Sequence, residues 1–154
     1  MASVLRPIVT ATLVAGTLDI SAAIGLTLYF GMRSVGDMLR FVASGPFPSA
    51  TDWGSAGAAL GLAVHFTLMA IMVAAYVLVA ARQPALRARP VLWGVAFGLL
   101  TYVVMNLIVV RLRFGGPFPP STRAIVTQLF CHIVLVGIPT ALIAARQLRT
   151  RAFG

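Results

Sequence analysis

Four polar side chains stand out because each lies inside a long apolar run of the chain: Asp19, His65, Asn106 and His132. A carboxyl group at the centre of a membrane helix costs roughly 2.5 to 3.5 kcal/mol on insertion scales, so such groups face a partner or a cavity. Asp and His exchange protons or bind divalent cations, and Asn donates and accepts hydrogen bonds. These four residues therefore form the candidate ligand or ion site.

The first interpretation of these residues is structural. Asp19 hydrogen-bonds across to His65 or His132, and Asn106 bonds to Tyr102 or to a backbone carbonyl. Such bonds fix the register between membrane helices, and each contributes about 0.6 kcal/mol on average. The chain would then be a structural or accessory subunit of a larger membrane complex.

The second interpretation is a proton or cation site of a transport-associated module. Asp19 would be the anionic ligand or proton carrier, His65 and His132 the neutral nitrogen ligands, and Asn106 an orienting group. A divalent metal such as zinc accepts two His and one Asp, with water in the fourth position. The metal ligands predicted from this pattern are thus Asp19, His65 and His132.

The third interpretation is haem b held between His65 and His132. The two histidines lie in runs that cross the membrane in the same direction, at equal offsets from the start of each run, so they reach the same depth. Bis-histidine ligation would use both of the histidines in the chain and leave Asp19 beside the haem without a partner.

The apolar runs themselves indicate an integral membrane protein. Hydrophobic residues make up 60% of the sequence and the mean hydropathy is +0.98, well above the values of soluble domains. A helix needs roughly 20 residues to cross a bilayer. Four runs are long enough, at residues 7–31, 54–81, 90–110 and 122–145. Because unpaired backbone groups are not tolerated in lipid, we expect an all-α membrane fold, a four-transmembrane-helix up-down bundle forming one domain over residues 1–154.

Charge placement predicts the orientation of the bundle. All twelve basic residues are Arg, the acids are three Asp, and the net charge is +9. The arginines flank the apolar runs, which indicates membrane topology and no nucleic-acid partner. The side that holds both termini has Arg6, Arg82, Arg87, Arg89, Arg146, Arg149 and Arg151; the other side has Arg33, Arg40, Arg111, Arg113 and Arg123. We expect both termini to be cytoplasmic, in a bacterial inner membrane.

The loops on the outer side carry two further patterns. Apolar and charged residues alternate at helical spacing over 34–44, which predicts a short interfacial helix; an extension of the first span is the alternative. The segments GPFPS at 45–49 and GPFPPS at 116–121 echo each other. This echo suggests two duplicated hairpins, related as a parallel repeat about an axis along the membrane normal.

Depth and helix face favour a common position for the polar side chains. At about 1.5 Å per residue, Asp19, His65 and His132 all lie roughly 16 to 18 Å from the outer ends of their runs, and Asn106 lies nearer the outside. Small residues recur on the same faces, as in the series Gly57, Gly61, His65, Met69 and Gly94, Gly98, Tyr102, Asn106. Such stripes allow close helix contact, so we expect the polar groups to face the bundle interior, within one chain or between protomers of a homo-oligomer.

Motifs of known enzymes are lacking. The sequence has no Gly-rich phosphate loop and no paired histidines on one helix, so no catalytic residue is predicted. Cys131 is the single cysteine, which rules out an intramolecular disulfide.

Several short segments resemble a family of small four-span bacterial membrane proteins to which no activity is assigned. The resembling segments are AGTLD at 15–19, FVASG at 41–45, LAVHF at 62–66, MNLIV at 105–109, and His132 with GIP at 137–139. The resemblance touches all four spans and implies a four-helix inner-membrane fold. The resemblance does not distinguish the structural role, the proton or cation site and the haem site from one another.

Overall fold

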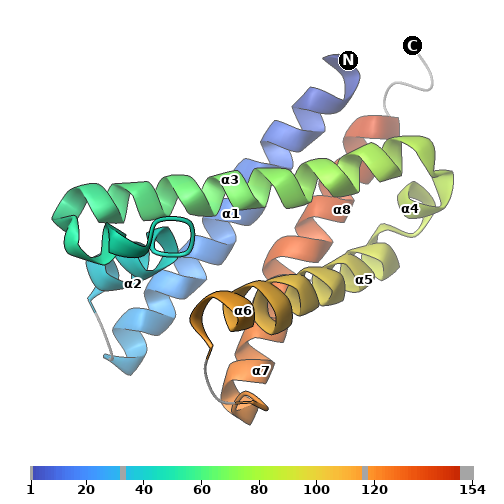
Figure 1. Ribbon diagram of the computed structural model, residues 1–154. Helices are drawn as coiled ribbons and strands as arrows, with labels where there is room; N and C mark the ends of the chain where they lie inside the picture. Colours follow the sequence, from blue (N-terminus) through green and yellow to red (C-terminus); the bar gives the residue numbers. More distant parts are fainter. Residues whose placement is uncertain (1, 32–33, 116–117, 150–154) are drawn as a thin grey trace.

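The computed structural model of the chain describes residues 2–31, 34–115 and 118–149. Every regular element in these ranges is helical (Figure 1). Arg33, Arg151 and the Gly116-Pro117 part of the second loop motif lie outside the described residues. In chain order the elements are α1 Ala2–Phe30, α2 Val35–Ala43, η1 Pro48–Asp52, α3 Gly54–Arg82, α4 Pro84–Ala88, α5 Pro90–Tyr102, η2 Val103–Val109, α6 Val110–Phe114, α7 Thr122–Phe130, η3 Cys131–Gly137 and α8 Ile138–Arg149.

Four helical segments are long and apolar enough to cross a membrane, as the sequence predicts. They are Val4–Phe30, Gly54–Arg82, Pro90–Phe114 and Thr122–Leu148. The first, third and fourth helices extend several residues beyond the predicted limits of 7, 110 and 145. The reason is that helical hydrogen bonding continues into flanking segments of lower hydropathy. Arginines at the ends of the apolar runs, such as Arg6, Arg113 and Arg146, therefore lie within the helices.

Small residues form the contacts between the long helices. The buried core contains alanines of α1 and α8 packed around Met69, Val73 and Val77 of α3. Gly94 and Gly98 of α5 meet the backbone of the fourth span, where a Cβ on Gly98 would lie 2.6 Å from the His132 carbonyl oxygen. This confirms the contact role expected for the glycine stripe of the third span, since only glycine permits such an approach.

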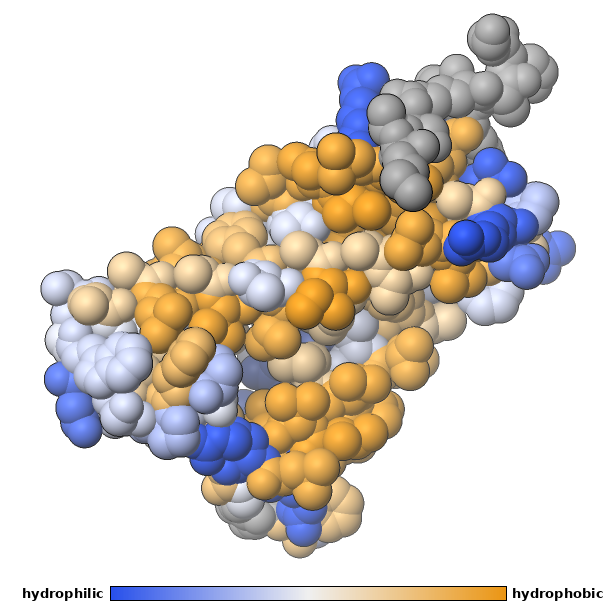
Figure 2. Space-filling view, turned by 45° about the horizontal axis from the view of Figure 1, so that its top comes forward, coloured by the Kyte–Doolittle hydropathy of each residue, from blue (hydrophilic) through white to orange (hydrophobic). Residues whose placement is uncertain are grey.

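Large apolar side chains lie mainly on the outside. Figure 2 shows a broad apolar surface along the middle of the molecule and hydrophilic residues gathered at its two ends. Among the exposed side chains are Leu5, Leu28, Ile71, Leu100 and Leu112, which are 57% exposed or more. A soluble domain does not present an apolar surface of this extent, whereas a lipid-facing surface requires one.

Helix α2 is a separate element and not an extension of α1. Ser34 caps its first turn by accepting from the Asp37 amide, and the Asp37 side chain accepts from the Ser34 amide in return. The helix packs against α3, where Gly61 lies so close that an added Cβ would overlap the Leu39 carbonyl. The glycine stripe of α3 therefore receives α2 at Gly61, which the stripe alone did not predict.

The second and third spans leave a seam between them. The closely packed pairs of long elements in the described part of the chain are α1 with α3, η3 and α8, α5 with η3 and α8, and α3 with α8. Helices α3 and α5 are not such a pair, and meet through the rings of Tyr76 and Phe97, whose centroids are 4.8 Å apart. Space for a cavity therefore exists between them.

Two widened helical turns interrupt the third and fourth spans. Elements η2 and η3 are π-helical, and the amides of Val110 and Ile138 bond back five residues to the carbonyls of Met105 and Ile133. In the fourth span the π segment ends at Gly137, two residues before Pro139. Segments of this kind occur frequently at functional sites.

Replacing Gly98 by Ala is predicted to destabilise the fold by about 1 to 3 kcal/mol, because the added Cβ meets backbone atoms of the fourth span that cannot rotate away. Gly25→Ala is the matched control, since no atom lies within 4 Å of its added Cβ. Thermal unfolding of the purified protein in detergent measures both. Equal melting temperatures for the two variants would contradict the packing described here.

The N-terminus of α2 is predicted to weaken in acid. Hydrogen bonds from the Ser34 side chain and from Arg40 hold the pKa of Asp37 below its usual value of 3.8. A lowered pKa contributes stability that is present above the unfolded pKa and is lost as pH falls through the folded one. The protection factors of the α2 amides, which correct for intrinsic exchange, should therefore fall below about pH 3.8 in the native chain, and Asp37→Asn should remove this pH dependence. Identical pH profiles for both proteins would refute the capping role.

Candidate functional site

Asp19 and His65 face each other between α1 and α3. The His65 Nε2 is 2.9 Å from the Gly16 carbonyl oxygen, and its Nδ1 is 4.0 Å from the Asp19 carboxylate. Gly16 permits this approach, because a Cβ there would lie 2.6 Å from the Phe66 ring. The His65 side chain is 11% exposed and that of Asp19 25%, so the pair is largely enclosed.

The hydrogen bond to Gly16 determines which nitrogen of His65 carries a proton. A carbonyl oxygen only accepts, so Nε2 must donate, and in the neutral ring Nδ1 then holds a lone pair. That lone pair faces the Asp19 carboxylate, and two acceptors oppose each other unless a proton lies on one of them. A proton on either Asp19 or His65 Nδ1 would relieve this opposition.

His132 is held in a different way, between the third and fourth spans. Thr101 donates its hydroxyl proton to the Gly98 carbonyl at 3.0 Å, so its oxygen accepts from His132 Nδ1 at 3.1 Å. The other ring nitrogen, Nε2, accepts from the Asn106 amide at 2.9 Å. Both nitrogens of a neutral His132 are thus satisfied by neutral partners, and the side chain is buried.

The π-helical turn explains how Thr101 and Asn106 reach the same imidazole. Residues five apart point about 140° apart on an α-helix with its 3.6 residues per turn. Where the backbone bonds from i to i+5, as in η2, residues at this spacing come closer to one face. His132 lies in the matching segment η3, so the two widened turns meet at the bond between Asn106 and His132.

The predicted single site is therefore divided into two clusters. Asp19 pairs with His65, and Asn106 pairs with His132. Over residues 2–31, 34–115 and 118–149, no group of three His, Cys, Asp or Glu side chains is placed to hold a metal ion. The structure thus does not bring Asp19, His65 and His132 together as the predicted metal ligands. The physical reason is that Thr101 and Asn106 occupy both nitrogens of His132.

The predicted haem site meets the same obstacle. Haem ligation needs an imidazole nitrogen with a free lone pair. The Nε2 of His65 donates to Gly16, and the Nε2 of His132 accepts from Asn106. At His132, where Thr101 occupies the other nitrogen, the bond from Asn106 would have to break before the two rings could bind one iron.

A cavity of about 480 Å³, which we call the seam cavity, lies in the gap between α3 and the third span. Asp19 and His65 line it together with Met69, Met72 and Met105. Polar atoms contribute little of its wall, because the remaining lining is mainly Val, Leu and Phe. The Asp19 and His65 pair is therefore accessible from the seam cavity, whose walls are largely apolar.

One end of the seam cavity is bounded by α6 and the loop after α2. Arg113 donates from Nε to the Gly45 carbonyl at 2.7 Å and from Nη2 to the Ser44 carbonyl at 2.8 Å. The rings of Phe41 and Phe114 stack beside it, with centroids 4.4 Å apart. These contacts join α6 to the loop after α2. The two residues that accept from Arg113 lie 68 and 69 positions before it in the sequence.

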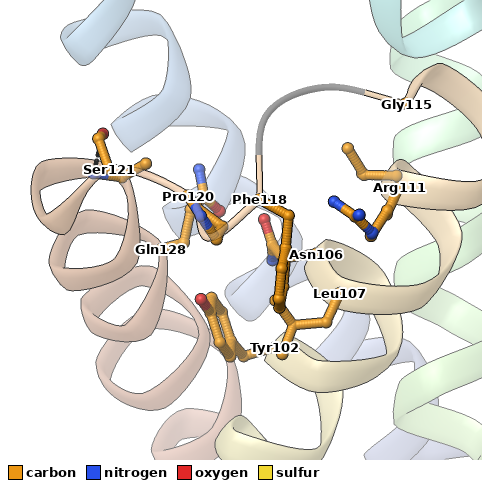
Figure 3. A pocket seen from close by; sticks show the side chains of 11 residues that line it. Tyr102, Asn106, Leu107, Arg111, Gly115, Phe118, Pro120, Ser121 and Gln128 are labelled. Carbon is orange, nitrogen blue, oxygen red and sulfur yellow. Dashed lines mark hydrogen bonds between the residues drawn. The ribbon is translucent and has the colours of Figure 1, made fainter.

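A second cavity of about 320 Å³ lies under the loop before α7 (Figure 3). Asn106, Tyr102 and Gln128 point into it, and Arg111 lies at its edge with its guanidinium carbon 4.4 Å from the centre of the Phe118 ring. Asn106 thus lines this cavity, whereas Asp19 and His65 line the other. The two polar clusters open into different spaces.

Sequence reasoning missed three contributors to these clusters. Thr101 and the Gly16 carbonyl bind the two histidines, and Arg113 closes the seam cavity. A threonine in an apolar run and a backbone carbonyl carry no signal, because both occur in any membrane helix. The sequence places Arg113 beside the second predicted outer loop, but no sequence pattern indicates that its partners lie in the first predicted outer loop.

Comparison of the chain with protein-family models, with curated proteins and with solved structures gives no match.

The bond between Asn106 and His132 is predicted to contribute a coupling energy of about 0.6 kcal/mol, and at most about 1.7, as other interhelical bonds in membranes do. A double-mutant cycle with Asn106→Leu, His132→Phe and the combined variant measures it by unfolding in detergent. A matched cycle of Asn106→Leu with Asp19→Asn should give no coupling, because these residues belong to different clusters. Equal coupling in both cycles would contradict this division.

Proposed function

We propose that this chain is a small transport-associated protein of the bacterial inner membrane that binds an exchangeable proton or a cation at Asp19 and His65. The observation that carries the proposal is the 4.0 Å approach of Asp19 to His65 Nδ1 while Nε2 donates to Gly16. A proton held by either group relieves the repulsion between the carboxylate and the Nδ1 lone pair. The pair supplies a binding site when that proton leaves.

The two states of the pair differ by one charge. With the proton present, the pair is neutral overall, as a carboxylic acid beside an imidazole or as a carboxylate beside an imidazolium. After the proton leaves, a carboxylate and a nitrogen lone pair face the same space with a net charge of −1. Asp19 is the one acid in the four spans, since Asp37 and Asp52 lie in α2 and η1. A cation that enters can neutralise it, because an unpaired charge in the membrane interior is costly.

The proposed topology is an up-down bundle with both termini in the cytoplasm and α2 at the outer membrane surface. The arginine distribution and the apolar middle of the molecule support this orientation. In that orientation the closure formed by Arg113 lies on the outer side, and the contact of Tyr76 with Phe97 lies on the inner side. The Asp19 and His65 pair lies between these two contacts.

A structural role is the competing function, and His132 supports it. Its network with Thr101 and Asn106 has both ring nitrogens paired and shows no place for an added proton. This cluster holds the third and fourth spans together whatever the first cluster does. The proposal therefore assigns proton or cation binding to one histidine and helix contact to the other.

Asp19→Asn is predicted to bind fewer protons per chain than the native protein, because the pair loses its carboxyl group and can no longer share a proton. Potentiometric titration of the protein in lipid nanodiscs measures this number, and the nitrogen resonances of His65 identify the site. Asn106→Leu is the control, since it alters only the other cluster. A titration of His65 that is unchanged in Asp19→Asn would refute the proposal and leave the structural role.

A further inference from the structure

The seam cavity is much larger than a proton or a bare metal ion requires. Its volume of about 480 Å³ is in the range of small-molecule pockets, which run from about 300 to about 1,000 Å³. Pockets of this kind combine apolar walls with a few polar groups that orient the ligand. Here the polar groups are Asp19, His65 and Arg113, and the walls are methionine, valine, leucine and phenylalanine.

The charge of the pair selects the kind of head group that fits. Deprotonated Asp19 and His65 Nδ1 are both acceptors and carry a net negative charge, so they match a group that donates hydrogen bonds and is positive. A primary ammonium meets both conditions with three donors. A carbonyl or carboxylate head group does not, because it would place acceptors against acceptors.

The other charged or titratable groups near the pair leave room for such a cation. Arg113 lines the same cavity, but its Nε and Nη2 donate to the carbonyls of Gly45 and Ser44 at the outer closure. Cys131 on η3 interacts electrostatically with Asp19 and is a buried thiol. Over residues 2–31, 34–115 and 118–149, no cation is bound directly to Asp19 when His65 is neutral.

The cavity is also reachable from the apolar surface of the protein. Val109 and Val110 line it, and they are 42% and 36% exposed on the outside of the third span. Figure 2 shows a hollow in the apolar surface between the helices, with more hydrophilic atoms at its base. An apolar molecule dissolved in the bilayer can enter by this route without crossing the helix backbone.

We infer that the seam cavity binds a lipophilic primary amine in its ammonium form, in exchange for the proton of the Asp19 and His65 pair. This inference rests on the proposed function of that pair. The ammonium group lies against Asp19 and His65, and the apolar body lies along Met69, Met72 and Met105. No covalent bond changes: one ammonium enters and one proton leaves, so the net charge of the occupied site is unchanged.

Binding of naphthylmethylamine to the protein in lipid nanodiscs tests the inference, with naphthalenemethanol as the neutral probe of nearly the same shape. We expect the amine to bind at least about tenfold more tightly than the alcohol, a difference of about 1.4 kcal/mol, because only the ammonium replaces the proton. Under conditions in which the pair is protonated, each bound amine should release about one proton into a weakly buffered medium. Equal affinities, or binding without proton release, would overturn the inference.

Three variants separate this inference from the proposed function. Asp19→Asn should lose the preference for the amine. Met72→Trp and, as an independent substitution on another element, Val109→Trp should lower amine affinity at least about tenfold by filling the cavity, while the proton titration of His65 persists. If the native pair titrates and no amine binds, the inference fails and the proposed function stands; if the pair does not titrate, both fail.

Discussion

Water is absent from the middle of a bilayer, so a polar group there depends on hydrogen-bond partners within the protein. This constraint accounts for the arrangement of all four spans. The helices approach one another through alanine and glycine, as at Gly94, Gly98 and Gly137, where backbone meets backbone. Only at such short separations do a carbonyl on α1 and an imidazole on α3 come within hydrogen-bonding distance.

The two histidines show how partners decide the chemistry of one residue type. His132 has a neutral donor on one nitrogen and a hydroxyl acceptor on the other, which leaves it complete as a neutral ring. His65 has a carbonyl on one nitrogen and a carboxylate 4.0 Å from the other, so both of its neighbours are acceptors. The first arrangement favours a fixed contact, whereas the second favours exchange with a ligand.

The spans could be predicted from the sequence because hydropathy and length report directly on the lipid environment. The separate helix after Ser34 and the close contacts of Gly94 and Gly98 were also predictable, because capping residues and small-residue stripes have a local physical meaning. The division of the polar residues was not predictable. Depth places Asp19, His65 and His132 at one level, but which helices face each other depends on rotation about each axis, and the π segments η2 and η3 alter that rotation without a sequence marker.

The weak packing of α3 against α5 bears on the ligand concentration to which the seam cavity between them is exposed. Val109 and Val110 line this cavity and are partly exposed, so in the proposed membrane orientation the cavity exchanges solutes with the bilayer. An oil-soluble compound reaches a far higher local concentration in that phase than in the surrounding buffer. Apparent affinities expressed per litre of water would therefore follow the partition coefficient of each compound as much as its fit to the protein.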